Sequence, residues 1–264
     1  AISQTEKGIP PATSFQTLGD VTQDATQALT LVSAHERGPL RTWTRTASNG
    51  KTKLQQNKLI DPGVKVTSLT HFINQKNQKI LVAGGVDGSL SVIRVDKLLQ
   101  KIGPTQIGQS RLDSLEALPT GEVISGDDRS GIRWWTWQSP PGGMEALMPA
   151  SRRVFATGQG AIRALVAIPP QQQSSGNVLS AGADGSLRLL AQEPYALAQP
   201  LYPPQTTASS PAALTALTAW PQGDIASAYQ DGTICWWGSL TESQKIPTPT
   251  CRRLPEGVSS TVLA

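Results

Sequence analysis

The chain has 264 residues, of which 38% are hydrophobic and 16% charged, and its formal net charge is +4. This length can bury a large core, and this balance is typical of folded rather than disordered proteins. No stretch approaches 18 consecutive apolar residues, so no transmembrane segment is predicted. Lysine and arginine are scattered without a basic run, which argues against a nucleic-acid surface.

Residues 1–20 contain Gly8, Pro10 and Pro11 and little periodicity, so we predict an extended N-terminal leader or an edge strand there. The folded domain is placed at residues 21–264. The first residue is Ala1, and threonine, serine, glutamine and proline are abundant, which leans towards an exported mature chain over a cytoplasmic one. The two cysteines do not decide the compartment.

Five hairpin patterns recur along this domain, at residues 28–45, 79–95, 122–137, 177–192 and 224–238. Each has a small-residue pair, a tight turn and an apolar strand. Asp-Gly turns favour hairpins because glycine adopts positive φ without a steric penalty. The aligned turn residues lie 42 to 55 residues apart, and they are Gly38, Gly88, Ser130, Gly185 and Gly232. Such a period built from strands is typical of a β-propeller.

Further strands complete each repeat. A first strand is predicted at 66–72, 112–118, 162–168 and 214–220, and a weaker last strand at 52–60, 105–110, 154–158, 196–202 and 248–254. We therefore predict an all-β propeller of about five four-stranded antiparallel blades. Residues 258–264 look like a first strand without a hairpin, so they are expected to complete the first blade and close the ring. Six blades, using Ala12 to Leu18, or part of a larger propeller are the alternatives.

The repeats resemble those of the WD-repeat family. The small pairs are followed by the turn and, five residues after the turn residue, by Trp43, Trp135 and Trp237. The resemblance covers residues 28–264 but departs from the family at the residue after the tryptophan, which is Thr44, Arg94, Thr136, Ala191 or Gly238. The family's Gly-His pair is absent as well, so its His-Asp-Ser-Trp network is not expected. The resemblance implies a non-enzymatic protein–protein interaction module or scaffold subunit that docks another protein on its turn rim.

The partner-binding candidates on this rim are the turn residues His35, Glu36, Arg37, Asp87, Asp127, Asp128, Arg129, Asp184, Gln230 and Asp231. The simplest role for each aspartate is to cap its own turn. Arg41, Arg133 and Arg188 share one strand position and are also candidates. Pairing with the turn aspartates is favoured for them over a ring of positive charge that holds an anionic ligand.

No catalytic, cofactor or metal site is predicted. The chain has only two histidines and no phosphate-binding glycine loop, zinc spacing or nucleophile elbow. Asp127 and Asp128 are adjacent, and a solvated turn is favoured over a cation site. The alternative functions are a glycan-binding propeller and, less favoured, a propeller hydrolase with carboxylates in its channel.

Tryptophans and cysteines give expectations about the core. Trp137 is the best candidate for an exposed aromatic, and core positions are predicted for Trp43, Trp134, Trp135, Trp236 and Trp237. Cys235 and Cys251 lie on runs predicted to be neighbouring strands. A cross-strand disulfide and two separate buried thiols remain equal alternatives.

Overall fold

The computed structural model describes residues 12–18, 30–35, 38–48, 51–95, 100–106, 110–140, 143, 145–168, 177–191, 196–197, 201–202, 212–239 and 248–254. These residues form β-strands joined by turns and loops, and none of them lies in a helix. The strands make five separate four-stranded sheets, in each of which the strands neighbour one another in sequence order. The predicted all-β class and antiparallel four-stranded sheets are confirmed.

The central hairpin of each sheet is the one predicted from the turns. The five pairs are β2 (Thr30–His35) with β3 (Leu40–Ser48), β6 (Lys79–Gly85) with β7 (Ser89–Val95), β10 (Val123–Asp127) with β11 (Gly131–Gln138), β14 (Val178–Gly182) with β15 (Leu187–Ala191), and β18 (Asp224–Tyr229) with β19 (Thr233–Ser239). All five aligned turn residues have positive φ, between 71° and 98°.

An edge strand precedes each hairpin, and a last strand follows it. The first strands are β1 (Ala12–Thr17), β5 (Val66–Ile73), β9 (Leu112–Ala117), β13 (Ile162–Ala167) and β17 (Leu214–Ala219). The last strands are β4 (Lys51–Ile60), β8 (Gln100–Gln106), β12 (Ala146–Ala156), β16 (Ala196–Leu197) and β20 (Thr250–Arg253). The last strands vary most in length, in line with their weak sequence patterns.

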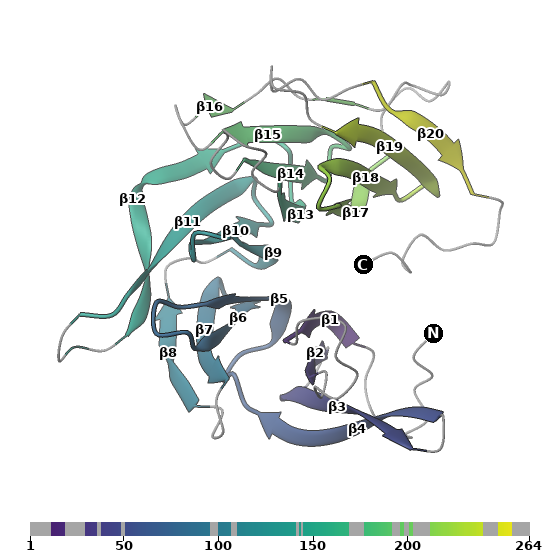
Figure 1. The fold of residues 1–264 in the computed structure, drawn as a ribbon. Coiled ribbons are helices and arrows are strands. Elements are labelled where there is room, and N and C mark those ends of the chain that lie inside the picture. Colours follow the sequence, from purple (N-terminus) through teal and green to yellow (C-terminus); the bar gives the residue numbers. More distant parts are fainter. Residues whose placement is uncertain are drawn as a thin grey trace. The chain divides into compact units, whose positions relative to one another are not determined.

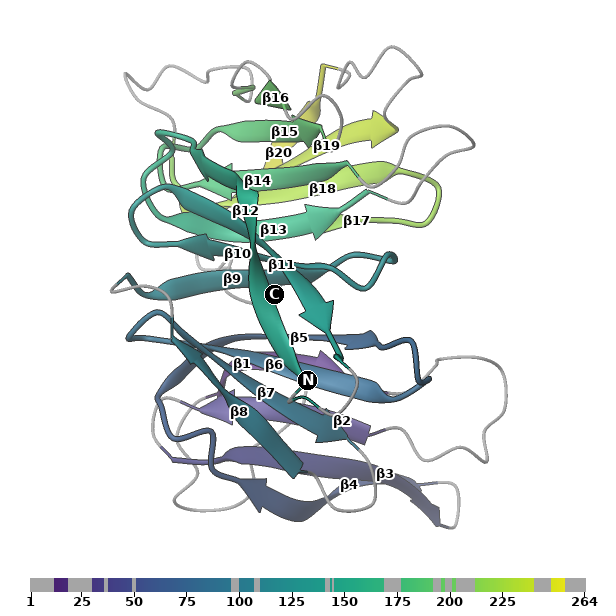
Figure 2. The same cartoon turned by 90° about the vertical axis from the view of Figure 1, so that its left-hand side faces the viewer.

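The chain divides into two compact units. Unit 1 is residues 1–111 with 139–146 and holds the first sheet (β1–β4) and the second (β5–β8); unit 2 is residues 112–138 with 147–264 and holds the third (β9–β12), fourth (β13–β16) and fifth (β17–β20). Within each unit the sheets are separate twisted layers (Figure 1, Figure 2).

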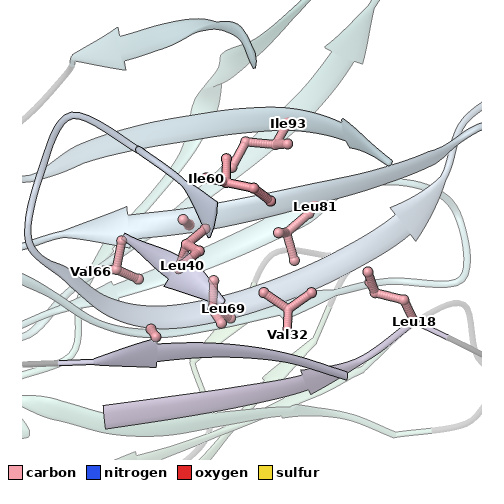
Figure 3. Close-up of a cluster of buried hydrophobic side chains, with 10 residues drawn as sticks. Leu18, Val32, Leu40, Ile60, Val66, Leu69, Leu81 and Ile93 are labelled. Carbon is pink, nitrogen blue, oxygen red and sulfur yellow. The ribbon is translucent and has the colours of Figure 1, made fainter. Parts of the chain in front are cut away.

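In unit 1, one apolar cluster joins the two sheets (Figure 3). The first sheet contributes Val32 and Leu40, and the second contributes Leu69, Leu81 and Ile93. Residues of one strand that are two apart point to the same face, so alternate positions of each strand enter this layer. Burial of such aliphatic side chains is the main stabilising contribution.

Unit 2 repeats the arrangement twice. Ile124, Ile132 and Trp134 of the third sheet pack against Ile162 and Val178 of the fourth. The opposite face of the fourth sheet then packs against the fifth through a second cluster, which contains Leu179, Leu187, Leu189, Leu214, Ile225, Cys235 and Trp237. The fourth sheet is thus buried on both faces, as its nearly continuous apolar strands require.

The first sheet differs from the prediction. Its first strand is β1, which pairs with β2 so that Phe15 lies opposite Ser33. β1 therefore fills the place expected for residues 258–264, and the expectation that these residues supply this strand is wrong. β1 can do so because Ala12–Leu18 has strand alternation and ends on Leu18, which is buried in the unit 1 cluster. The sheet accordingly begins inside the predicted leader, while residues 258–264 lie outside the described part of the chain.

The cysteine alternatives are resolved in favour of the disulfide. Cys235 on β19 lies directly opposite Cys251 on β20, and the two residues form a disulfide bond with a Cα–Cα distance of 4.1 Å. The bond ties the last strand to the fifth sheet. It encloses a short loop, so it is expected to stabilise the sheet by restricting the unfolded chain.

The tryptophans are only partly where they were predicted. Trp134, Trp135 and Trp237 are buried, and Trp43 and Trp137 are half-buried. The core prediction for Trp236 is wrong, because this side chain is 46% exposed. Trp236 lies on the face of the fifth sheet opposite the one that packs on the fourth sheet, and strand alternation alone could not reveal that no other described sheet of unit 2 packs on this face.

Candidate functional site: the hairpin turns

The hairpin turns are held by their own aspartates. Asp87 Oδ1 accepts from the Ser89 amide at 3.0 Å, Asp184 Oδ1 accepts from the Ser186 amide at 2.9 Å, and Asp231 Oδ1 accepts from the Thr233 amide at 3.0 Å. In the third sheet, Asp127 Oδ1 accepts from the amides of Arg129 and Gly131. The turn-capping role expected for these aspartates is present in all four turns.

Asp87 shows the electrostatic consequence of this capping. Partial burial opposes ionisation, but hydrogen bonds from the Ser89 hydroxyl and amide outweigh it and lower the pKa of Asp87 below its ordinary value. The carboxylate is therefore the form that holds the turn at neutral pH.

Three of the turns are also bonded to the loop that enters the first strand of their own sheet. The amide of Val86 donates to Lys65 O at 3.0 Å, that of Ala183 to Ala161 O at 2.9 Å, and that of Gln230 to Ala213 O at 2.8 Å. These bonds occur at the same turn position in the second, fourth and fifth sheets. The turn and the entry loop of one sheet thus form one rigid end, where exposed side chains are held in place.

Some of the predicted rim residues are exposed, and others are half-buried. Exposed side chains are those of Asp87, Asp128, Arg129, Gln230 and Asp231, whereas Asp127 and Asp184 are half-buried. Glu36 and Arg37 lie outside the described residues. The second sheet adds exposed Val86 to its turn. We use the name hairpin-turn rim for the exposed residues Val86, Asp87, Asp128, Arg129, Gln230 and Asp231.

His35 is not a rim residue. It ends β2, is only 4% exposed, and its Nε2 lies 2.7 Å from Ser33 Oγ. Ser33 Oγ also accepts from Trp43 Nε1 at 2.8 Å. His35 therefore completes a buried polar chain, and its prediction as a partner-binding residue is wrong on the ground of burial.

The same serine–tryptophan bond occurs in two more sheets. Trp135 Nε1 donates to Ser125 Oγ and Trp237 Nε1 donates to Ser227 Oγ, each at 2.8 Å. The serine–tryptophan part of the family's His-Asp-Ser-Trp network, which was not expected, is thus formed in these sheets without the aspartate. The ten-residue spacing between the serine and tryptophan was the sequence signal that could have revealed it.

The fourth sheet has Leu190 in place of the tryptophan, and a glutamine replaces the missing partner. Ser180 Oγ donates to Gln159 Oε1 at 2.7 Å, and Gln159 Nε2 donates to Ser186 O at 3.0 Å. Gln159 is fully buried in the loop before β13. Buried polar groups require partners, so this glutamine fixes the entry loop against the turn.

The three arginines share one strand position, and one of them, Arg41, is bonded to a glutamine and not to a turn aspartate. Arg41, Arg133 and Arg188 lie opposite Ser33, Ser125 and Ser180 on the third strands of their sheets. Arg41 Nη1 donates to Gln56 Oε1 at 2.7 Å rather than to a turn carboxylate. All three are half-buried and lie on interior strands of their sheets.

One half-buried carboxyl was not anticipated. Glu116 on β9 accepts a hydrogen bond at Oε1 from the amide of Ala167 on β13, at 2.9 Å. Burial raises its pKa to about 7, although the Ala167 bond opposes the rise. At the equivalent position the first strands of the other sheets have the uncharged residues Gln16, Thr70, Val166 and Thr218. An acidic residue at this position was the sequence feature that could have revealed the site.

Two further features concern the described residues, namely metal ligands and membrane-spanning helices. No three histidine, cysteine, aspartate or glutamate side chains gather there in a way that could hold a metal ion. Within the same part of the chain, no helix has the length and apolarity to cross a membrane. Comparison of the chain with protein-family models and with curated proteins finds no match.

Proposed function

We propose that the chain is a β-propeller of the WD-repeat kind, with the five sheets as its blades, and that it acts as a non-enzymatic interaction module. Support comes from five sheets with the same strand order and from the same positive-φ turn position in each. The serine–tryptophan bonds in three hairpins add to the resemblance. Fold alone does not set function, so the role depends on the hairpin-turn rim.

The observation that carries the role is the way the hairpin-turn rim is built. Its backbone is fixed by the aspartate caps, and in the second and fifth sheets also by the bonds to the entry loops, while its polar side chains remain exposed. A loop whose backbone is already fixed loses little backbone conformational entropy on binding, and loops on a rigid scaffold are where binding residues concentrate. The partner we propose is another protein, with both charge signs on its surface because Asp128 and Arg129 are adjacent.

A charge swap tests this role. The double variant Asp128→Arg/Arg129→Asp keeps the net charge and leaves Asp127, which holds the turn, unchanged. We expect a stoichiometric protein partner recovered by the tagged wild-type chain to be lost with this variant. The matched control is Thr120→Arg/Gln222→Asp, which places opposite charges on exposed turns at the other ends of their sheets. Equal loss with both variants, or with neither, would contradict docking on the hairpin-turn rim.

A glycan-binding propeller is the second candidate, because Trp220 and Trp236 form an exposed aromatic pair with ring centroids 4.7 Å apart. Indole rings offer an apolar face on which sugars stack. A saturable change in tryptophan fluorescence on titration with a sugar, absent in Trp236→Ala, would support this candidate over the first.

A further inference from the structure

In two sheets of unit 2 the end of the last strand is bonded to the hairpin turn. The residue that follows the last strand donates its backbone amide to the carbonyl of the aligned turn residue. In the third sheet Thr157 donates to Ser130 O at 2.9 Å, and in the fifth sheet Leu254 donates to Gly232 O at 3.0 Å. The last strand therefore helps to hold the residue whose positive φ shapes the turn.

In the fifth sheet a second bond joins the last strand to the hairpin-turn rim. Arg253 Nε donates to Asp231 O at 3.1 Å, and Asp231 is one of the exposed rim residues. β20 thus holds two consecutive residues of this turn, Asp231 and Gly232. The order of this part of the rim depends on whether β20 stays in the sheet.

The last strands of the third and fifth sheets are attached in different ways. β12 has eleven residues, whereas β20 has four and lies at the edge of the fifth sheet, where it pairs with β19 (Figure 1). Three side chains of β20 are exposed, and its half-buried residue, Cys251, packs on the apolar cluster and forms the disulfide bond to Cys235. The covalent bond therefore compensates for the short strand and its small buried surface.

The two sulfur atoms differ in access. Cys235 is fully buried in the apolar cluster between the fourth and fifth sheets, whereas Cys251 is half-buried on the edge strand. The rate of thiol–disulfide exchange depends on access to the sulfur that is attacked, which favours attack on Cys251. A buried free cysteine behaves as a small apolar residue, so the core can hold Cys235 as a thiol.

We propose that the disulfide of Cys235 and Cys251 is a site of reversible exchange with a dithiol, and that its reduction releases β20 and loosens the fifth hairpin turn. A thiolate of the dithiol bonds to Cys251 Sγ while the S–S bond breaks, and Cys235 Sγ leaves as a thiolate and takes up a proton. The second thiolate of the dithiol then attacks the dithiol sulfur of this mixed disulfide and releases Cys251, which is also protonated. The dithiol is oxidised by two electrons to a disulfide, and the two cysteines are reduced.

The consequence for binding rests on the proposed rim docking. When β20 is released, Asp231 O and Gly232 O lose the bonds donated by Arg253 and Leu254. A loosened turn must be ordered again when a partner binds, and this ordering opposes binding through lost conformational entropy. Reduction therefore weakens the binding of a partner that contacts Asp231.

The first experiment tests the exchange site on the native wild-type chain. The protein is treated with dithiothreitol without denaturant and quenched with excess N-ethylmaleimide in urea, and labelled thiols are counted by mass spectrometry. We expect both cysteines of the chain to be labelled. A brief treatment with the monothiol glutathione should leave its mixed disulfide on Cys251. Resistance to dithiothreitol until urea unfolds the protein, or a glutathione adduct on Cys235, would overturn the proposal.

The second experiment measures amide hydrogen exchange before and after reduction. Exchange at Leu254 and Gly232 should become at least about tenfold faster, because loss of a crosslink that closes a short loop lets the strand open locally. Thr157 is the matched control, since its amide makes the same bond to a turn without a disulfide. Ser186, whose amide donates to Asp184 in the turn of the fourth sheet, is the second control. Both control amides should keep their rates.

A variant and a reversal complete the test. Cys251→Ser removes the bond at the edge strand and leaves the core residue in place, so it should exchange like reduced wild type with or without dithiothreitol. Oxidised glutathione should restore slow exchange to reduced wild type but not to the variant. Unchanged exchange at Leu254 after full reduction, or faster exchange that extends to Ser186, would overturn the proposal. Neither experiment involves a partner, so this inference and rim docking can fail independently.

Discussion

Single residues set the backbone of the turns. Ser130 is the member of the aligned turn series that is not glycine, and its φ is 71°, whereas the four glycines lie between 78° and 98°. A side chain in this left-handed region is strained because Cβ approaches the neighbouring carbonyl oxygen. The third hairpin therefore forms against a local cost that the other four avoid.

We expect Ser130→Gly to raise the free energy of unfolding by about 0.5–1 kcal/mol, since relief of strain exceeds the added entropy of the unfolded chain. Denaturant titration measures the change. Gly232→Ser is the opposite control, because an added Cβ there meets no atom within 4 Å and only the φ of 83° resists it. Stabilisation by both variants would show that the turn φ is not the cause.

At the residue scale, Glu116 is expected to make the stability of the protein depend on pH. Its pKa is about 7 in the folded protein and 4.5 in the absence of burial. Between these values the folded protein holds a proton that the unfolded chain has lost, so stability falls as pH rises from about 4.5 to 7. The loss is about 2–3 kcal/mol at most.

We expect Glu116→Gln to remove this decline. The free energy of unfolding of the variant, taken relative to that of wild type, should therefore be higher at pH 8 than at pH 4. Urea unfolding across this range measures it. The control is Glu122→Gln, whose carboxylate accepts from Thr120 Oγ1 in an exposed turn contact at 3.3 Å. If Glu116→Gln showed the same decline in stability with rising pH as wild type, the decline could not be attributed to Glu116.

At the scale of elements, three of the five hairpins combine a local turn with a side-chain hydrogen bond between their two strands. Ser125 and Trp135 illustrate this, because both are buried and the indole has its hydrogen bond to the serine hydroxyl. The same bond recurs in the first and fifth sheets. It pins the two strands in one register, and a slip by one residue would turn the tryptophan to the other face.

We expect Ser125→Ala to lower the free energy of unfolding by about 1–3 kcal/mol, because it leaves the buried Trp135 Nε1 without this acceptor. In a Trp135→Phe background the same change should cost clearly less. Calorimetry of the four chains measures this coupling. An equal cost in both backgrounds would mean that the serine acts through packing alone.

The hairpins were accessible to prediction because they depend on residues close in sequence. The turn glycines act through their own φ, and Asp87 and Asp231 accept hydrogen bonds from amides two residues away, so their pattern predicts their geometry. The environments of His35 and Glu116 could not be predicted in this way. The burial of each depends on neighbours that no local pattern specifies, and in Glu116 the hydrogen-bond partner is 51 residues away.

At the scale of the whole molecule, the fold begins earlier than the composition of the N-terminus suggests. β1 pairs along β2, and Thr13 Oγ1 and Gln16 Nε2 reach across to Val66 O and His71 Nδ1 of the second sheet. Leu18 completes the core of unit 1. Residues predicted as a leader thus supply both hydrogen bonds and apolar contacts.

Deletion of residues 1–18 should therefore lower Tm by about 5 °C or more, because it removes β1 and exposes β2 as an edge. Deletion of residues 1–11 is the matched control, since it keeps β1 intact. Differential scanning calorimetry compares the two chains. Equal melting temperatures would show that β1 is dispensable and would restore residues 258–264 as a candidate first strand.

By itself the sequence determined the strands, the five hairpins and the positive-φ turns, because these follow from side-chain alternation and from the backbone freedom of glycine. Only the tertiary structure decided which face of each strand is covered. Trp134 and Trp236 occupy the same position of the same pattern, yet one is buried and the other is 46% exposed. Alternation separates the two faces of a sheet, but burial depends on whether another sheet lies against each face, and that is a property of distant residues.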